Sequence, residues 1–412
     1  MALESALMNV VFVAPYAMES TLRFARRTAE LPGVRLGVIS HEPGEVIVRE
    51  LGGKLAAFER VNDTLEPDQL VRAVRTMASH LGGKVDRILG VLEQLQEPMA
   101  VVRERLGIRG MDLGEAANFR DKARMKDVLR KSGLPCARHR LCTSAAEARA
   151  FAREVLPIVA KPPAGAGAKN TQRLESAEQL EAWIQSFPPS PEQPLLLEEF
   201  IQGREHSFDS VFLHGKMVFS SISEYTPGPL EVMQNPWIQW CVVLPRHIDG
   251  DEYDPIRREG ERGLHALGMV TGLSHMEWFR RADGSVAISE VGARPPGAQF
   301  TTLLSFAHDI DFYRAWAELL VFERFTPPTR NWSVGAVYLR GQGGQRVERV
   351  TGVDAVKREL GELVVQARIP RPGQPKSESY EGEGFVIVRH AETEVVRGAL
   401  KRALELLKVE MA

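Results

Sequence analysis

Hydrophobic and polar positions along the first 110 residues predict strands and helices in turn. Short apolar runs at residues 10–13, 34–39 and 87–92 are typical of buried strands. Residues 68–81, between the second and third runs, carry apolar side chains at helical spacing. Because strands that alternate with helices form βαβ units, this part is predicted to be an α/β unit with a parallel sheet that ends near Gly110.

After this unit the pattern changes to a mixture of helices and antiparallel strands. A helix is predicted over residues 119–131, where a Gly-Leu-Pro sequence ends it. His214-Gly215 predicts a hairpin turn between strands at residues 207–213 and 216–223. Further helices are predicted over residues 254–267, 298–307, 312–322 and 392–407.

A second predicted hairpin sets two glutamates opposite each other. Its strands flank Asp283-Gly284, a dipeptide typical of two-residue hairpin turns. In that register Glu277 lies directly opposite Glu290, on a face that also includes residue 288. Like charges directly opposite on a sheet are destabilising, and a divalent cation held by carboxylate oxygens would offset the repulsion. The alternatives are two solvated surface glutamates, or a register that slips by one residue.

Composition and charge narrow the classes of function. The 52 Lys+Arg and 54 Asp+Glu residues give a net charge of −2, so no basic surface for nucleic acid is expected. No apolar run reaches the roughly 18 residues that span a bilayer, and no signal peptide is expected at the N-terminus. The three cysteines, Cys136, Cys142 and Cys241, lack CxxC spacing and suit a reduced cytoplasm. A nucleic-acid-binding surface and a membrane span are therefore not expected.

Three cations stand in contexts that favour phosphate binding. Lys122 shares a helical stripe with apolar residues, and Lys161 ends a strand beside a glycine-rich stretch whose amides can cradle phosphate oxygens. Arg294 lies in a Gly/Pro-rich bend after Glu290, and its planar fork suits a phosphate or a tetrahedral oxyanion. Each charge alone is more often a solvated surface group. Together with the glutamate pair they indicate a magnesium–nucleotide site, although no P-loop, GxSxG or HExxH sequence is present.

Five motifs in order resemble the ATP-grasp superfamily of carboxylate–amine ligases, over about residues 110–325. They are Asp121-Lys122; Ile158-Val-Ala-Lys161 with its glycine loop; Glu198-Glu-Phe-Ile201 with Glu205; His275-x-Glu277; and Glu290-x-x-x-Arg294. The resemblance implies a fold of mixed α/β and α+β class. Its implied parts are a Rossmann-like N-terminal domain over residues 1–115, an ATP-grasp domain over 116–325 with a small lid at about 135–200, and a C-terminal α+β module over 326–412.

The resemblance also implies which residues bind ATP. Lys122 and Lys161 would hold the α- and β-phosphates, under a flexible flap that includes Gly165 and Gly167. Glu198 would open the hinge strand. Other implied contacts are the Glu199 carbonyl and Ile201 amide to adenine, and Glu205 to the ribose hydroxyls.

Metal binding and catalysis are implied for three residues. Glu277 and Glu290 would bind Mg²⁺, with Mn²⁺ as an alternative, and Arg294 would stabilise the transferring phosphate and the tetrahedral intermediate. Gly292 stands where many superfamily members carry Asn, which removes one oxygen ligand for a second ion.

The implied activity is ADP-forming ligation of a carboxylate to an amine, through an acyl phosphate. Arg-Pro-Pro-Gly at residues 294–297 and the long N-terminal domain favour the L-amino-acid or dipeptide ligase branch. The alternatives are a carboxylase-type enzyme of the same superfamily and a catalytically silent nucleotide-binding protein. Residues 223–240 are expected to line the acceptor side. The protein is expected to be cytoplasmic and to act on small molecules. A homodimer is the assembly considered.

Overall fold

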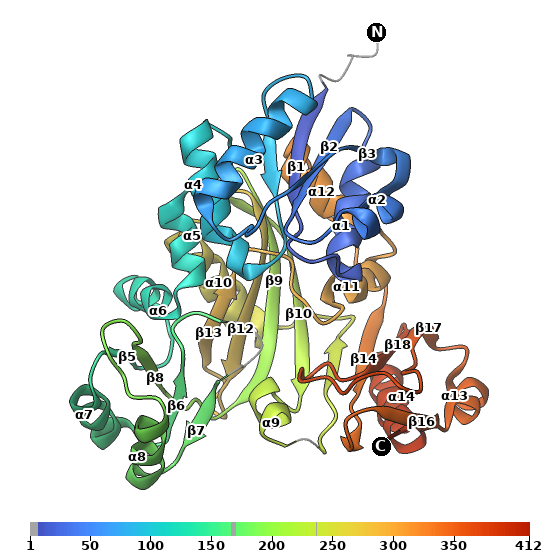
Figure 1. Ribbon diagram of the computed structural model, residues 1–412. Coiled ribbons are helices and arrows are strands. Elements are labelled where there is room, and N and C mark those ends of the chain that lie inside the picture. Colours follow the sequence, from blue (N-terminus) through green and yellow to red (C-terminus); the bar gives the residue numbers. More distant parts are fainter. Residues whose placement is uncertain (1–6, 166–169, 236) are drawn as a thin grey trace.

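The structure is a computed structural model that describes residues 7–165, 170–235 and 237–412 (Figure 1). Its first part is a four-stranded sheet of order β3-β2-β1-β4 whose strands are all parallel, as the sequence predicts. The strands are β1 (Met8–Val13), β2 (Val34–Ser40), β3 (Leu55–Arg60) and β4 (Arg87–Leu89). Helices α1 (Glu19–Ala29), α2 (Glu45–Leu51), α3 (Pro67–His80) and α4 (Gln96–Leu106) accompany them.

A second four-stranded sheet, of order β5-β8-β6-β7, forms a small lobe at the lower left of Figure 1. Its strands are β5 (His139–Cys142), β6 (Ile158–Lys161), β7 (Gln172–Leu174) and β8 (Leu195–Glu199), with helices α7 (Ala145–Val155) and α8 (Ala177–Ser186). This lobe has its own apolar core, which includes Phe151 and Leu180. Two helices lead into it, α5 (Leu113–Arg120) and α6 (Lys122–Lys131).

The largest sheet has eight strands in the order β13-β12-β9-β10-β11-β14-β18-β17. They are β9 (Arg204–Leu213), β10 (Lys216–Thr226), β11 (Cys241–Leu244), β12 (Gly272–Arg280), β13 (Val286–Gly292), β14 (Ser333–Leu339), β17 (Val364–Arg368) and β18 (Gly384–His390). The sheet is continuous from β11 to β14, so it crosses residue 326. The domain boundaries given above stay a prediction.

The remaining elements surround this sheet. Helices α9 (Pro229–Gln234), α10 (Asp254–Leu267), α11 (Phe300–His308) and α12 (Phe312–Phe322) belong to the central part, and α13 (Val353–Leu360) and α14 (Thr393–Leu406) to the C-terminal part. A small sheet joins β15 (Gln342–Gly343), β16 (Val347–Thr351) and β19 (Lys408–Met411). No helix in the described part of the chain is both long enough and apolar enough to cross a bilayer.

The N-terminal domain packs directly on α12. Phe24 of α1 lies 4.9 Å from Trp316, and Phe12 of β1 lies 6.3 Å from the same ring, measured between ring centroids. Buried side chains of both parts form one continuous core. This packing holds the carboxyl end of β4 next to the central sheet.

The structure confirms the turn of the first predicted hairpin and differs from the prediction at the second. His214 and Gly215 have φ of 52° and 76°, and Leu213 pairs with Lys216, so the first two-residue turn is confirmed. At the second, the Arg281 amide donates to the Ser285 carbonyl at 2.9 Å, which leaves a loop of three residues.

A bulge in β13 then corrects the register of the second hairpin. Trp278 pairs with Ile288, but Glu277 pairs with Glu290, so one extra residue lies on β13. The predicted opposition of the glutamates is therefore confirmed. The prediction that Ile288 shares their face is wrong, because the bulge turns Ile288 into the core beside Met276.

Candidate active site

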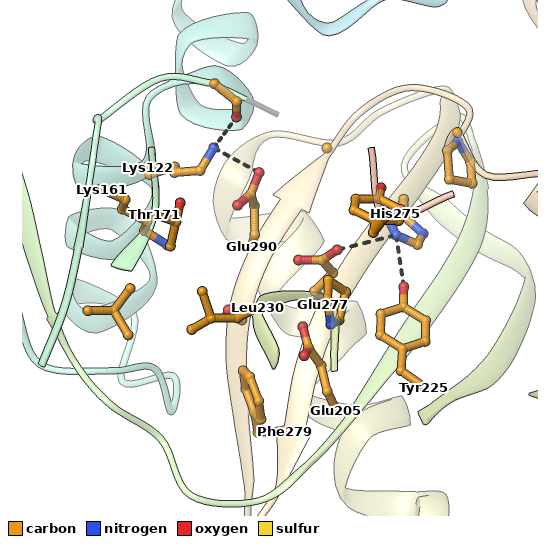
Figure 2. Close-up of a pocket in the computed structure, with 18 of the residues that line it drawn as sticks. Lys122, Lys161, Thr171, Glu205, Tyr225, Leu230, His275, Glu277, Phe279 and Glu290 are labelled. Carbon is orange, nitrogen blue, oxygen red and sulfur yellow. Dashed lines mark hydrogen bonds and ion pairs between the residues drawn. The ribbon is translucent and has the colours of Figure 1, made fainter. Parts of the chain in front are cut away.

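One cleft lies where the small lobe, the central sheet and the N-terminal domain meet, and Figure 2 shows part of its lining. It collects every predicted site residue within the described part of the chain: Lys122, Lys161, Gly165, Glu198, Glu199, Ile201, Glu205, Glu277, Glu290 and Arg294. Gly167 lies outside the described residues.

Asp121 fixes the position of Lys122 by ending one helix and starting the next. Its backbone is extended, with φ −88° and ψ 110°, and its carboxylate accepts from the Ala123 amide at 2.8 Å. The predicted single helix is therefore two helices, and Lys122 is the first residue of α6. Its ammonium lies 2.9 Å from Glu290 Oε1 and donates to the Gly165 carbonyl at 2.6 Å.

A second lysine on the same helix was not expected from the sequence. Lys126 is fully buried, donates to the Ser289 carbonyl at 2.7 Å, and lies 3.3 Å from Glu198 Oε2. The other oxygen of Glu198 lies 2.9 Å from Lys161 Nζ. Burial opposes ionisation of Glu198, but the two ammonium groups outweigh it and hold its pKa below the ordinary value. The carboxylate thus fixes Lys161 at the cleft.

The opposed glutamates differ in their electrostatics. Burial raises the pKa of Glu290, but Lys122 and Lys161 outweigh it, so that pKa lies below its ordinary value. Burial and then the charge of Glu290 raise the pKa of Glu277. A divalent cation was the expected source of compensation, and the structure adds a second one, because Lys122 lies 2.9 Å from Glu290 Oε1.

The pair nevertheless fits a divalent ion that is shared with a ligand. Within the described residues, no group of three or more His, Cys, Asp or Glu side chains is arranged to hold a metal ion. Mg²⁺ is usually bound by one or two carboxylates and completes its shell with substrate phosphates and water. Glu277 and Glu290 supply two such carboxylates, and the like-charge stress on Glu277 is what a cation would relieve.

His275 is held beside Glu277 by a buried aspartate. Its Nδ1 lies 2.6 Å from Asp209 Oδ1, and its Nε2 lies 3.3 Å from the Tyr225 hydroxyl. Burial lowers the pKa of His275, but Asp209 outweighs it and raises that pKa above its ordinary value. Asp209 lies within a strand with no motif of its own, so the sequence carried no signal for it.

The hinge segment leaves one backbone donor at the cleft. The Glu199 amide donates to the Arg138 carbonyl at 2.8 Å, and the Phe200 amide to the Pro157 carbonyl at 3.1 Å. For the Ile201 amide we find no acceptor among the described residues. Nearby, burial and then the charge of Glu277 raise the pKa of Glu205 well above its ordinary value.

Arg294 is bound by a carboxylate from the N-terminal domain. Its Nη2 lies 3.0 Å from Glu93 Oε2, and Arg120 Nη1 lies 2.6 Å from the other Glu93 oxygen. The Arg294 Nη1 donates to the Pro295 carbonyl at 3.0 Å, and its buried Nε has no hydrogen-bond partner among the described residues. Glu93 follows β4, and ligands bind beyond the carboxyl ends of parallel strands, so its position was a signal that the sequence analysis missed.

Comparison with known proteins gives a consistent result. Residues 119–226 match the ATP-grasp domain family. The L-arginine-specific L-amino acid ligase of Bacillus subtilis is 26% identical over 251 residues, which is 58% of this chain and 59% of that protein. The chain thus spans less than two thirds of this curated relative.

Solved structures share the fold over nearly the whole chain. The L-amino acid ligase of Bacillus licheniformis superposes with a TM-score of 0.79 at 17% identity and covers 98% of this chain and 99% of its own. The N5-carboxyaminoimidazole synthetase of Staphylococcus aureus, solved with ADP, gives a TM-score of 0.71 at 11% identity and covers 96% and 97%. At these identities the likeness establishes the fold.

Proposed function

From the ATP-grasp domain that this chain contains, we propose that it is an ADP-forming ligase that joins a small-molecule carboxylate to an amine. The observation that carries the proposal is the convergence on one cleft of Lys122, Lys161, the opposed glutamates and Arg294. The L-amino acid ligase relative supports amino acids as the substrate class. ATP is the proposed phosphoryl donor.

The proposed reaction has two steps. A carboxylate oxygen attacks the γ-phosphorus of ATP, the bond from that phosphorus to the bridging oxygen breaks, and ADP leaves. The amine nitrogen then attacks the acyl carbon, phosphate leaves, and the amine loses a proton to solvent. Phosphoryl transfer of this kind depends on positioning and charge stabilisation, which agrees with a cleft that brings Lys122, Lys161 and Arg294 to the opposed glutamates.

The residues divide this work between binding and charge stabilisation. Lys122 and Lys161 neutralise the α- and β-phosphates, and Glu277 and Glu290 hold Mg²⁺. When bound, that ion supplies charge neutralisation at the transferring phosphate. Arg294 donates to the phosphate and to the tetrahedral intermediate, where its planar fork matches two oxygens at once.

The function is tested by release of ADP. The full-length chain is incubated with Mg²⁺, ATP and pairs of L-amino acids, and we expect ADP and phosphate only when a carboxylate and an amine are both present. Bicarbonate-dependent release without an amino acid would indicate the carboxylase alternative. ATP binding with no carboxylate-dependent turnover would indicate a silent nucleotide-binding protein.

Lys161→Ala is expected to weaken ATP binding in a chain that still folds, at some cost in stability because the buried Glu198 keeps only Lys126 as its counter-ion. A hydrogen bond to a charged group contributes about 1.5–3 kcal/mol, so we expect a Kd roughly tenfold to a hundredfold higher. Titration calorimetry measures it, with circular dichroism as the check on folding. The control is Lys84→Ala, since that side chain is 88% exposed and lies outside the cleft. Equal affinity in the two variants would remove Lys161 from the phosphate site.

Glu93→Gln is expected to lower kcat and leave the Kd for ATP unchanged. The amide keeps the shape but loses the ion pair that orients Arg294. Misplacement of a reacting group by about 1 Å costs up to a hundredfold, so we expect a loss of roughly tenfold or more in kcat. Single-turnover kinetics measures it. A loss confined to ATP affinity would contradict the positioning role.

The same proposal includes three finer points. Mn²⁺ is an alternative to Mg²⁺, because carboxylate and phosphate oxygens suit both ions. A homodimer in solution and a cytoplasmic location are also proposed. Light scattering on the purified chain measures the assembly.

A further inference from the structure

Four aromatic rings line the part of the cleft beyond Glu277 and His275. We name them the aromatic wall: Tyr225, Trp240, Phe300 and Tyr380. Tyr225 and Phe300 belong to β10 and α11, Trp240 precedes β11, and Tyr380 lies in the loop before β18.

The rings of the wall contact one another as one surface. The Trp240 centroid lies 5.4 Å from that of Tyr225 and 4.7 Å from that of Tyr380. Tyr225 and Phe300 lie 5.9 Å apart. The wall therefore combines residues of the predicted acceptor-side segment with a residue of the C-terminal part.

The wall begins beside the opposed glutamates and away from the lysines. His275 Nε2 lies 3.3 Å from the Tyr225 hydroxyl and 3.9 Å from Glu277 Oε1. Figure 2 shows Lys122 and Lys161 on one side of the glutamates, and His275 and Tyr225 on the other. A carboxylate that reaches the transferring phosphate near Glu277 thus has the wall within reach of its own side chain.

We propose, on the basis of the ligase function above, that the activated substrate is an amino acid with a bulky uncharged side chain, aromatic or branched apolar, which packs on the aromatic wall. Tyr225, Trp240 and Phe300 are buried, so the wall meets a ligand through ring edges and through the half-buried Tyr380. Such edges pack favourably against other rings and apolar groups. No cation belongs to the wall, so it offers no partner to an acidic side chain.

The nearby carboxylates disfavour charged side chains. Burial, followed by the charges of Glu277, Asp209 and Glu205, raises the pKa of Tyr225, so its hydroxyl stays neutral beside the wall. An acidic side chain would find the nearest cations, His275 and Arg294, already paired with Asp209 and Glu93. For a cationic side chain, Asp209 is already bound to His275 and Glu277 is assigned to the metal ion.

Hydroxylamine tests the inference without knowledge of the natural amine, because it attacks an acyl phosphate to give a hydroxamate and releases phosphate. The full chain is assayed with Mg²⁺, ATP, hydroxylamine and one amino acid at a time. We expect kcat/KM for L-phenylalanine and L-leucine to exceed that for glycine, L-aspartate and L-arginine by about tenfold or more. A preference for glycine, L-aspartate or L-arginine would overturn the substrate class and leave the ligase function standing. No ADP release with any amino acid would overturn both.

Substitutions in the wall separate a binding role from a structural one. Tyr380→Ala should lower the ratio of kcat/KM for L-phenylalanine over glycine by about tenfold, and Tyr380→Phe should keep it. A structural defect would lower kcat/KM equally for both substrates and leave their ratio unchanged, which would contradict the inference. Trp237→Ala is the matched control, because Trp237 lies in the same segment as Trp240 but is 62% exposed and outside the cleft lining.

Discussion

Arg294→Lys is expected to lower turnover by roughly a hundredfold to a thousandfold, the range for loss of one donor to a developing charge. The Kd for ATP should change little. One nitrogen of Arg294 binds Glu93 and another donates to the Pro295 carbonyl. The buried Nε has no hydrogen-bond partner among the described residues. A lysine keeps the positive charge but has a single nitrogen, so it cannot hold Glu93 and the reacting phosphate in the same geometry.

Single-turnover kinetics and titration calorimetry on the same protein separate the two effects. Arg262→Lys is the control, since Arg262 is 51% exposed on α10 and its partner is Glu259. Parallel losses of ATP affinity and turnover in Arg294→Lys would place the arginine in ground-state binding instead. Normal turnover would remove it from the reaction altogether.

The opposition of Glu277 and Glu290 was predicted correctly, although the turn and the bulge that produce it were not. Asp283-Gly284 suits a two-residue turn, and it also suits a three-residue loop with glycine in the left-handed region, where Gly284 has φ of 81°. The longer loop shifts the register by one residue, and the bulge in β13 restores it. Alternation of side chains does not reveal a bulge, so Glu277 and Glu290 were placed correctly and Ile288 was not.

The site residues that were not predicted from the sequence have partners that are far away along the chain. Glu93 and Arg294 are 201 positions apart and follow strands of different sheets, β4 and β13. Lys126 lies on the predicted apolar stripe of its helix, but lysine is rarely buried without a partner, and its partner comes from β8. The parallel sheet was predictable because local pattern determines it, and the motif residues were predictable because the motifs resemble those of a known superfamily. Ion pairs between domains depend on packing that local pattern does not describe.

The two glutamates should respond in opposite ways when neutralised in the absence of ligand. Glu290 is stabilised by Lys122 at 2.9 Å, so Glu290→Gln should lower the melting temperature at pH 7. Glu277 is buried against Glu290, and both effects raise its pKa. Glu277→Gln should therefore match or exceed the wild-type melting temperature at pH 7.

The pH dependence follows from the directions of the two pKa shifts. A raised pKa means that the folded state holds the proton more tightly, so stability falls as pH rises from the ordinary value of 4.5 through the pKa of the folded state. The gain from Glu277→Gln should be present at pH 7 and disappear near pH 4.5. The lowered pKa of Glu290 stabilises the fold fully above the ordinary value of 4.5, so the deficit of Glu290→Gln should shrink as pH falls from 4.5 through the lower pKa of the folded state.

With magnesium and ATP present, the two variants should share the same deficit relative to wild type. A ligand that binds only the folded state raises its stability by mass action, so wild type should gain melting temperature with both present. Glu277→Gln and Glu290→Gln should each gain much less. Turnover should fall more than about a hundredfold in both variants. Even removal of a residue that only supports a metal ligand lowers metal affinity or activity about ten- to a hundredfold.

Melting curves across pH, with and without magnesium and ATP, measure all of these effects on one set of proteins. Glu261→Gln, on α10 with 44% of its side chain exposed, is the control for loss of a carboxylate. Two solvated glutamates would leave activity and the ligand-induced shift equal in every protein. Opposite changes in melting temperature without ligand show that the two carboxylates differ in their partners. A smaller ligand-induced shift in both variants shows that the two carboxylates bind one ion together. A pair of surface glutamates produces neither result.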